Sequence, residues 1–252
     1  MPTYGDHRAA KALAVSTVDN LVWSSSQIAA DSRLVTAFHI GFTGTAHDFN
    51  SVSRHRVKSA EETILDVDEQ ELDSFAQAMS PSNLGYAASA TSWSYRLGGM
   101  PHGGAMSVEI DTDGTGSGAG TARLSWSQAD GPTGQYVKYI GKPANLAAST
   151  LESIYKFSQK GLMIGFSIPS DGFDRIILFL AGIGIVLNLS AVAFREVMLN
   201  ENVTTDITSW FFKLKTPLPA GEGSYMLVDT NATWAGAAER IAIATVIPTV
   251  GG

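Results

Sequence analysis

The sequence predicts a mainly β fold, an antiparallel β-sandwich of jelly-roll type with two short peripheral helices. After Gly161 most of the chain consists of short apolar runs, several with a period of two, and turn residues separate them. Helical periods are too rare for alternating βαβ units. The chain has 252 residues, without a fixed-period repeat or a charged linker. We therefore expect a single β-rich domain over residues 1–252, with an N-terminal extension of roughly residues 1–30.

The first half of the chain contains three strand patterns. Residues 33–42, RLVTAFHIGF, place Phe38, Ile40 and Phe42 on one alternating face, which predicts a half-buried strand. The segments ATSWSYRL and AMSVEIDT predict two more strands. Alternation resumes after the glycine-rich loop that follows AMSVEIDT, at Leu124 and Trp126. We therefore predict a hairpin across this loop.

Two segments have helical spacing. In DEQELDSFAQAM, residues 68–79, Leu72 and Phe75 share one face, and Asp68 stands three residues before Glu71 as a capping pair. The second segment, Pro143–Ser158, carries an apolar stripe and is followed by Gly161. Both segments are predicted to be short helices at the periphery of the sheets.

Residues 176–194 form a run of nineteen uncharged residues. A membrane span needs about 20 mostly apolar residues, so length alone permits insertion. Gly182 and Gly184 interrupt the run, however, and apolar residues alternate after Gly184. We predict two buried strands joined by a turn at Gly182–Gly184, and we expect no membrane contact.

The charge balance argues against nucleic-acid binding by bulk electrostatics. The formal net charge is -7, which provides no positive field for phosphates. The local run SRHRVK contains Arg54, Arg56 and Lys58. Any contact with nucleic acid is therefore predicted to use this local patch.

The candidates for ligand chemistry are sparse. Asp111 and Asp113 match the first half of a calcium loop, but Ala122 stands where the motif requires a bidentate glutamate, so the pattern predicts at most a weak calcium site. The absence of cysteine excludes disulfides and thiolate sites. No nucleophile, base and orienting group can be named together. We expect neither a cofactor nor enzymatic activity.

One aromatic run indicates a binding surface. Trp210, Phe211 and Phe212 are consecutive, so at least one large ring faces away from the core side of a strand. Exposed aromatic rings are common at protein interfaces. We predict a subunit interface at these residues, although a sandwich that covers both faces of the strand would bury them.

These features favour a structural protein that self-associates into a large assembly, such as a viral or phage capsid subunit, located in the virion. The expected partners are copies of itself and other virion components. A carbohydrate-binding module or lectin is the alternative, with Trp93, Trp126 or Trp234 as exposed stacking platforms. The second alternative is a membrane-acting protein that uses residues 176–194. The N-terminus contains no convincing signal peptide.

Overall fold

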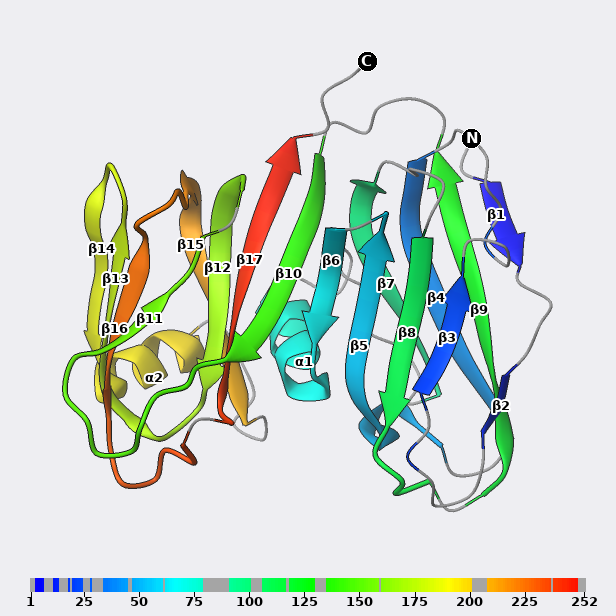
Figure 1. Ribbon diagram of the computed structural model, residues 1–252, viewed down its shortest axis with the longest axis horizontal. Helices are drawn as coiled ribbons and strands as arrows, with labels where there is room; N and C mark the ends of the chain where they lie inside the picture. Colours follow the sequence, from blue (N-terminus) through cyan, green and yellow to red (C-terminus); the bar gives the residue numbers. More distant parts are fainter. Residues whose placement is uncertain are drawn as a thin grey trace.

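The chain forms two β-sandwiches that lie side by side along the longest axis of the molecule (Figure 1). The computed structural model describes residues 3–6, 11–13, 18, 20–24, 28, 34–44, 47–60, 62–78, 91–100, 106–116, 118–129, 135–158, 160–200, 208–236 and 238–248. Strands β1 to β9 build the sandwich that we call N-terminal, and strands β10 to β17 build the C-terminal sandwich.

The N-terminal sandwich has two antiparallel layers. One layer has the order β2-β9-β4-β7, with β1 beside β2 along β9, and the other has the order β3-β8-β5-β6. A short 3-10 helix, Phe49–Ser51, precedes β5. The strands are β1 Thr3–Asp6, β2 Lys11–Leu13, β3 Asn20–Ser24, β4 Leu34–Gly44, β5 Val52–Ser59, β6 Glu62–Val67, β7 Ser92–Met100, β8 Met106–Thr112 and β9 Gly120–Ala129.

The C-terminal sandwich has the layers β10-β17-β12-β15 and β11-β16-β13-β14, again with antiparallel neighbours. Its strands are β10 Gln135–Pro143, β11 Ser153–Lys156, β12 Leu162–Pro169, β13 Phe173–Leu180, β14 Gly184–Ser190, β15 Ser209–Pro219, β16 Tyr225–Thr230 and β17 Arg240–Pro248.

The two sandwiches have the same topology. When eight strands are counted from β2 in the first and from β10 in the second, each sandwich has one layer in the order 1-8-3-6 and the other in the order 2-7-4-5. Two four-stranded layers wound in this way form a jelly roll. The predicted jelly-roll fold is confirmed, and the topology occurs twice in the chain.

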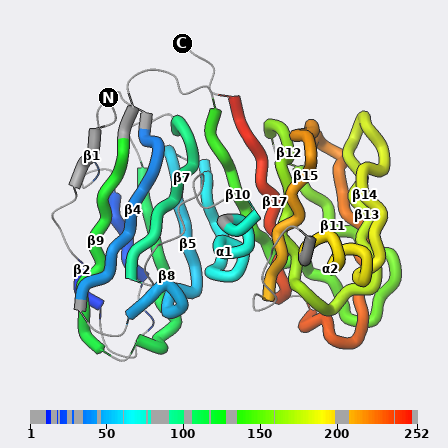
Figure 2. The backbone as a smooth tube through the Cα atoms, turned by 180° about the vertical axis from the view of Figure 1, so that it is seen from behind, coloured from blue at the N-terminus to red at the C-terminus, as the bar shows by residue number. Residues whose placement is uncertain are grey.

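The helices also occupy equivalent places. Helix α1, Glu69–Ala78, and helix α2, Ala191–Asn200, each connect the fifth strand of their sandwich to the sixth. Figure 2 shows α1 between the two sandwiches and α2 on the C-terminal one. The predicted helix at residues 68–79 is thus confirmed, including its cap: Glu71 N donates to Asp68 Oδ1 at 2.8 Å, and Asp68 N donates to Glu71 Oε2 at 2.9 Å.

Strand β10 joins the sandwiches. It pairs with β17 in its own layer, runs parallel to β6 at Tyr139 and Ile140, and meets β7 where Tyr136 lies opposite Gly98. Each sandwich has its own hydrophobic core. One continuous sheet links the two cores through β10. Whether the two sandwiches act as a single domain stays a prediction. Three strands, β1, β2 and β3, lie within the range predicted as an N-terminal extension.

The predicted helix at Pro143–Ser158 is wrong. Pro143 ends β10, and residues 153–156 form β11. Asn145, Ser149 and Glu152 have positive φ angles between 52° and 55°, which a right-handed helix excludes. The apolar stripe does not form one buried face, because Tyr155 points into the core whereas Ile154 is exposed.

The predicted hairpin across the glycine-rich loop is also wrong. Strands β8 and β9 follow one another in the chain but belong to opposite layers, since β8 pairs with β5 and β3 whereas β9 pairs with β4, β1 and β2. The period of two correctly predicts two strands, but a local pattern does not reveal that the loop crosses between layers.

Residues 176–194 lie in two strands and the start of a helix. Strands β13 and β14 pair across the turn at Gly182, as predicted. The second strand ends at Ser190 rather than continuing to Phe194, because the Ser190 hydroxyl accepts a hydrogen bond from Ala193 N and caps α2. Phe194 and Met198, four residues apart, then point from α2 into the core. No helix among the described residues is long and apolar enough to cross a membrane.

Candidate functional site

The aromatic run on β15 is divided between two cores. Trp210 is 4% exposed and packs in the C-terminal core, whereas Phe211 is 1% exposed and packs in the N-terminal core cluster. Neither ring is free on the surface, because α1 covers one face of β15 and the C-terminal core lies against the other; for these two residues the structure has the buried alternative. Phe212 is half-buried, and its interface role stays a prediction.

Phe211 belongs to an aromatic cluster at the junction of the sandwiches. Phe75 of α1 stacks on Tyr139 of β10 with 4.5 Å between ring centroids, and its ring lies 4.7 Å from that of Phe211. The Tyr139 hydroxyl donates to the Glu71 carbonyl oxygen at 3.0 Å. Helix α1 of the N-terminal sandwich is thereby packed onto the C-terminal sandwich.

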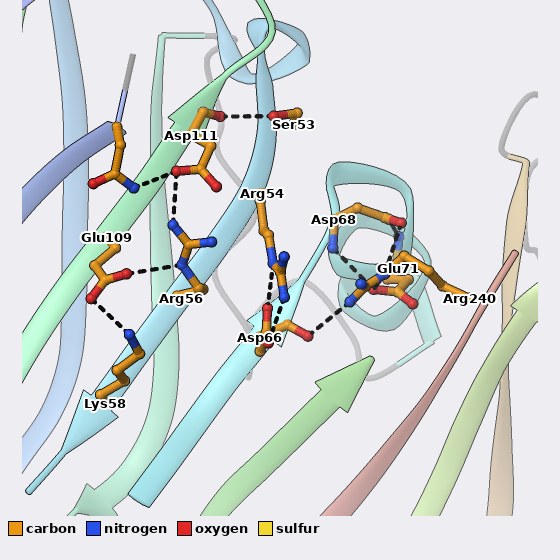
Figure 3. A network of polar contacts seen from close by, with 11 residues as sticks. Ser53, Arg54, Arg56, Lys58, Asp66, Asp68, Glu71, Glu109, Asp111 and Arg240 are labelled. Atoms are coloured by element: carbon orange, nitrogen blue, oxygen red, sulfur yellow. Dashed lines mark hydrogen bonds and ion pairs between the residues drawn. The ribbon is translucent and has the colours of Figure 1, made fainter. Parts of the chain in front are cut away.

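A buried polar network lies beside this cluster. Arg240 Nε of β17 is 3.2 Å from Glu71 Oε2 and 3.5 Å from Asp68 Oδ2, and Arg240 Nη2 donates to the Asp66 carbonyl oxygen (Figure 3). Gly141 leaves the room for these groups, since a Cβ at this position would lie 2.5 Å from both Arg240 Nη2 and Glu71 Oε2. The network connects the start of α1 to β17, the last described strand.

Burial controls the charge of this network. Desolvation, together with the neighbouring Asp68 carboxylate, raises the pKa of Glu71 to about 8 against the opposing effect of Arg240. Desolvation also raises the pKa of Asp68. Sequence reasoning identified Asp68 and Glu71 only as a helix cap; the contact with Arg240 spans 169 positions and has no local signal.

The predicted nucleic-acid patch is neutralised by carboxylates. Arg54 donates to both carboxylate oxygens of Asp66, at 2.6 and 2.8 Å. Arg56 pairs with Glu109 at 2.9 Å and with Asp111 at 2.7 Å, and Lys58 pairs with Glu109 at 3.0 Å. Figure 3 shows these pairs along β5 and its neighbouring strands. Three cations meet three carboxylates, so the cluster has no excess positive charge to attract phosphate.

The predicted calcium ligands have other partners. Asp111 Oδ1 accepts hydrogen bonds from Arg56 and Asn20, and Asp113 Oδ1 accepts from the backbone and side chain of Thr115. The hydrogen bonds from Thr115 to Asp113 form a turn that an aspartate side chain stabilises without a metal ion. Across the residues that the structure describes, no group of three or more His, Cys, Asp or Glu side chains could hold a metal ion.

The stacking platforms expected of a carbohydrate-binding protein are not on the surface. Trp93, Trp126 and Trp234 are all buried. Trp93 packs edge-on against Phe42 and Phe49 in the N-terminal core. The lectin interpretation therefore loses the residues on which it depended.

An apolar groove lies between β14, α2 and β15, and Ala78 at the end of α1 also lines it. Its volume is about 530 Å³, and its lining includes Val186, Leu187, Val197, Met198, Phe212 and Leu214. Nearby, Ile183, Ile185 and Val192 are exposed. The apolar run at residues 176–194 is the sequence signal for this surface, but the prediction of two buried strands is wrong for β14, in which no residue is buried.

Comparisons with known proteins concern the fold. No protein-family model matches the chain, and no curated protein matches its sequence. Among solved structures, the chain is similar to the major capsid protein of bacteriophage PM2, with a TM-score of 0.68 at 9% identity over 100% of both chains. It is also similar to a chain in the structure of Sulfolobus Turreted Icosahedral Virus, with a TM-score of 0.67 at 11% identity, over 97% of this chain and 90% of that one.

A third similarity is to the PBCV-1 virus capsid, with a TM-score of 0.53 at 7% identity, over 98% of this chain and 93% of that one. Each alignment spans nearly the whole chain and therefore includes both sandwiches. The paired jelly-roll architecture is thus the fold of these viral capsid chains.

Proposed function

We propose that this chain is a subunit of a viral or phage capsid and that it self-associates into a shell. The supporting observation is the full-length likeness to the major capsid protein of bacteriophage PM2, which extends over both sandwiches and the junction between them. A partial match would be expected if only a common sandwich were shared, since single jelly rolls occur in proteins of many functions.

The surface chemistry is consistent with this proposal. The groove beside β14 and the exposed Ile183, Ile185 and Val192 place apolar area on the side of the C-terminal sandwich that carries β14 and α2. Contiguous apolar area on a protein surface is typical of protein contacts. The role is structural rather than enzymatic, the location is the virion, and the partners are copies of the chain and other virion components.

The proposal is tested by the mass of the purified protein in solution. We expect light scattering over a range of protein and salt concentrations to show a concentration-dependent step from monomers to large discrete particles. Electron microscopy of the same samples identifies shells. A monomer under every condition would contradict the proposal.

A further inference from the structure

The two helices occupy equivalent places in the fold, but they begin in different ways. The start of α2 is uncharged, since the Ser190 hydroxyl accepts a hydrogen bond from Ala193 N. At the corresponding positions α1 has Asp68 and Glu71, and the carboxylate of each accepts from the backbone N of the other. Because α2 begins at the same place without charge, the two carboxylates of α1 are more than capping requires.

The Glu71 carboxylate is buried with too little positive charge around it. Glu71 is 1% exposed, and its Oε1 atom has no hydrogen-bond partner among the described residues. Arg240 lies beside both Glu71 and Asp68, so one guanidinium faces two carboxylates (Figure 3). The neighbouring guanidinium of Arg54 is already paired with Asp66. With every group ionised, the network holds an uncompensated negative charge. Such a charge is costly when buried, and one bound proton removes it.

The other titratable groups around the network do not supply the missing positive charge. They are Glu69 and Asp73 on α1, Glu239 before β17, Tyr139 on β10 and Tyr155 on β11. Burial raises the pKa of Tyr155 to about 12 and also raises that of Tyr139, so both stay neutral at pH 8. On β15, Lys213 lines the groove with Ala78, at the other end of α1. The surroundings of Glu71 therefore favour proton binding.

A polar cavity lies where the network meets the C-terminal sandwich. Its volume is about 130 Å³, and its lining combines the network with Pro169 of β12 and with Thr208 and Ser209 at the start of β15. The Asp68 side chain is 33% exposed, so protons exchange with the solvent at this point. Gln70 Oε1 accepts from Thr208 N at 3.1 Å. The start of α1 is thus held against the C-terminal sandwich directly beside the excess charge.

We propose that Asp68 and Glu71 share one bound proton in the folded chain, and that release of this proton loosens α1 from the C-terminal sandwich. While the proton is bound, a single negative charge faces Arg240. After its release the two carboxylates repel each other in a buried place, and movement of the helix start into water relieves the repulsion. The junction is therefore a pH-sensitive contact within one chain. This inference goes beyond the capsid proposal and does not depend on assembly.

The direction of the pH effect follows from the two environments of Glu71. In the closed junction, desolvation raises the pKa of Glu71 to about 8, whereas its ordinary value is 4.5. A helix start that has moved into water has the ordinary pKa. The contribution of the proton to closure is therefore complete below pH 4.5 and is lost as the pH rises through 8.

Hydrogen exchange of α1 tests the loosening. We expect its protection factor, corrected for the intrinsic exchange rate, to fall by about tenfold or more between pH 6 and pH 8.5, because each pH unit below the raised pKa weakens closure by up to tenfold. Glu71→Gln keeps the shape of the side chain and cannot release a proton. In this variant the fall should be smaller by a factor of about ten. A merely structural role of Glu71 would not change the pH profile.

The matched control is Glu196→Gln, which changes an exposed glutamate on the equivalent helix, α2. Its α1 should respond to pH like that of the parent chain. Asp68→Asn is a second variant that keeps the helix cap, because asparagine caps as well as aspartate. It removes one of the two competing carboxylates, so its fall in protection should also be smaller than that of the parent. Circular dichroism at pH 6 establishes that the variants are folded.

The proton itself is observed by carbon-13 NMR of the side-chain carboxyl groups. The resonance that Glu71→Gln lacks identifies Glu71. We expect this resonance to titrate far above the ordinary midpoint of 4.5. A midpoint near 4.5 would show that the network holds no proton at neutral pH, and the inference would be wrong.

The exchange data provide the second way to overturn the inference. Equal pH responses of α1 in the parent chain, Glu71→Gln and Asp68→Asn would mean that the proton does not control the junction. Both measurements use the full chain at concentrations where it is monomeric. Failure here would therefore leave the capsid proposal standing, and a chain that never assembles would leave this inference standing.

Discussion

The two sandwiches share a topology but differ in what their equivalent surfaces meet. In the C-terminal sandwich, the outer face of the layer that contains β12 and β15 carries Ile164, Phe211, Ala242 and Ala244, which pack with the N-terminal core cluster. In the N-terminal sandwich, the outer face of the equivalent layer is polar. His39 lies there between Ser94 and Ser127, at 2.7 and 2.8 Å. Equivalent faces thus differ in polarity: the face that meets the other sandwich is apolar, whereas the face that does not meet it carries His39 and serines.

The helices differ in the same way. Helix α1 directs Phe75 into the junction, whereas α2 exposes Val192, Arg195 and Glu196. An apolar contact within a chain persists as part of the core. A surface through which separately folded copies would meet must also keep each free copy soluble. A surface that combines polar and apolar residues does so. The difference between the halves is therefore that α1 forms part of a junction within the chain, whereas α2 carries charged residues on its exposed face.

The largest effect should come from removing the aromatic ring that joins the halves. We expect Phe75→Ala to lower the free energy of unfolding by about 3–5 kcal/mol, the usual cost of truncating a buried phenylalanine. Because Phe75 contacts both Tyr139 and Phe211, peptides from both sandwiches should lose protection in hydrogen exchange measured by mass spectrometry.

Phe194→Ala is the matched control. Phe194 is buried in α2, and its ring contacts, with Phe166, Phe173, Trp210 and Phe212, all lie in the C-terminal sandwich. Its loss of protection should be confined to that sandwich. Identical exchange patterns in the two variants would contradict the assignment of Phe75 to the junction.

The second effect concerns close backbone approach at the junction. Gly98 has a φ of 85°, and a Cβ there would lie 2.6 Å from the Gln135 carbonyl oxygen of β10. Gly182 has a φ of 81°, but a Cβ there would meet nothing within 4 Å. We expect Gly182→Ala to cost about 1–3 kcal/mol from the dihedral alone, and Gly98→Ala to cost more because β10 must move. Chemical denaturation measures both, and equal costs would show that β7 and β10 are not in close contact.

The third effect is a sensitivity to acid that belongs to the N-terminal sandwich. All five histidines lie at or before residue 102. Burial lowers the pKa of His55 to about 3, so the folded chain keeps this residue neutral while the unfolded chain takes up a proton below pH 6.5. Stability is therefore complete above pH 6.5 and falls as the pH falls toward 3.

We expect this residue to contribute a loss of about 2 kcal/mol between pH 6.5 and pH 5. His55→Phe preserves the ring that stacks on Phe49 and removes the titrating group. Denaturation at several pH values should show a smaller slope for the variant than for the parent chain. If the stability of the variant and that of the parent chain changed equally with pH, His55 would not titrate as its burial requires.

The sequence predicted the strands well because burial of one strand face leaves a period of two, and it predicted α1 because a capping pair precedes an apolar stripe. It failed at residues 143–158, where apolar spacing resembled a helix and positive φ angles left no local signal. It also failed to detect the duplication, since topology can be repeated without any repeated residue pattern. The junction of Glu71 with Arg240, and the burial of Trp210 and Phe211, depend on contacts distant in sequence that only the folded chain reveals.

The smallest expected effect comes from a lysine that already forms an ion pair, compared with lysines that form none with a described residue. Lys58 is held by Glu109, and its side chain is 42% exposed. Lys213 and Lys215 are exposed on β15 without an ion pair to any described residue. We expect Lys58→Ala to change stability by less than about 1 kcal/mol and to leave the binding of a single-stranded oligonucleotide, followed by fluorescence anisotropy at low salt, unchanged.

Glu109→Gln tests the reason for that result. This substitution removes the carboxylate shared by Arg56 and Lys58, so the cluster gains one uncompensated positive charge. Oligonucleotide binding at low salt should then rise and should fall again as salt is added. If Lys58→Ala instead abolished binding by the parent chain while Lys215→Ala had no effect, the run from Arg54 to Lys58 would be a nucleic-acid contact despite its ion pairs. Carboxylate pairing would then be the resting arrangement of these cations, which phosphate displaces.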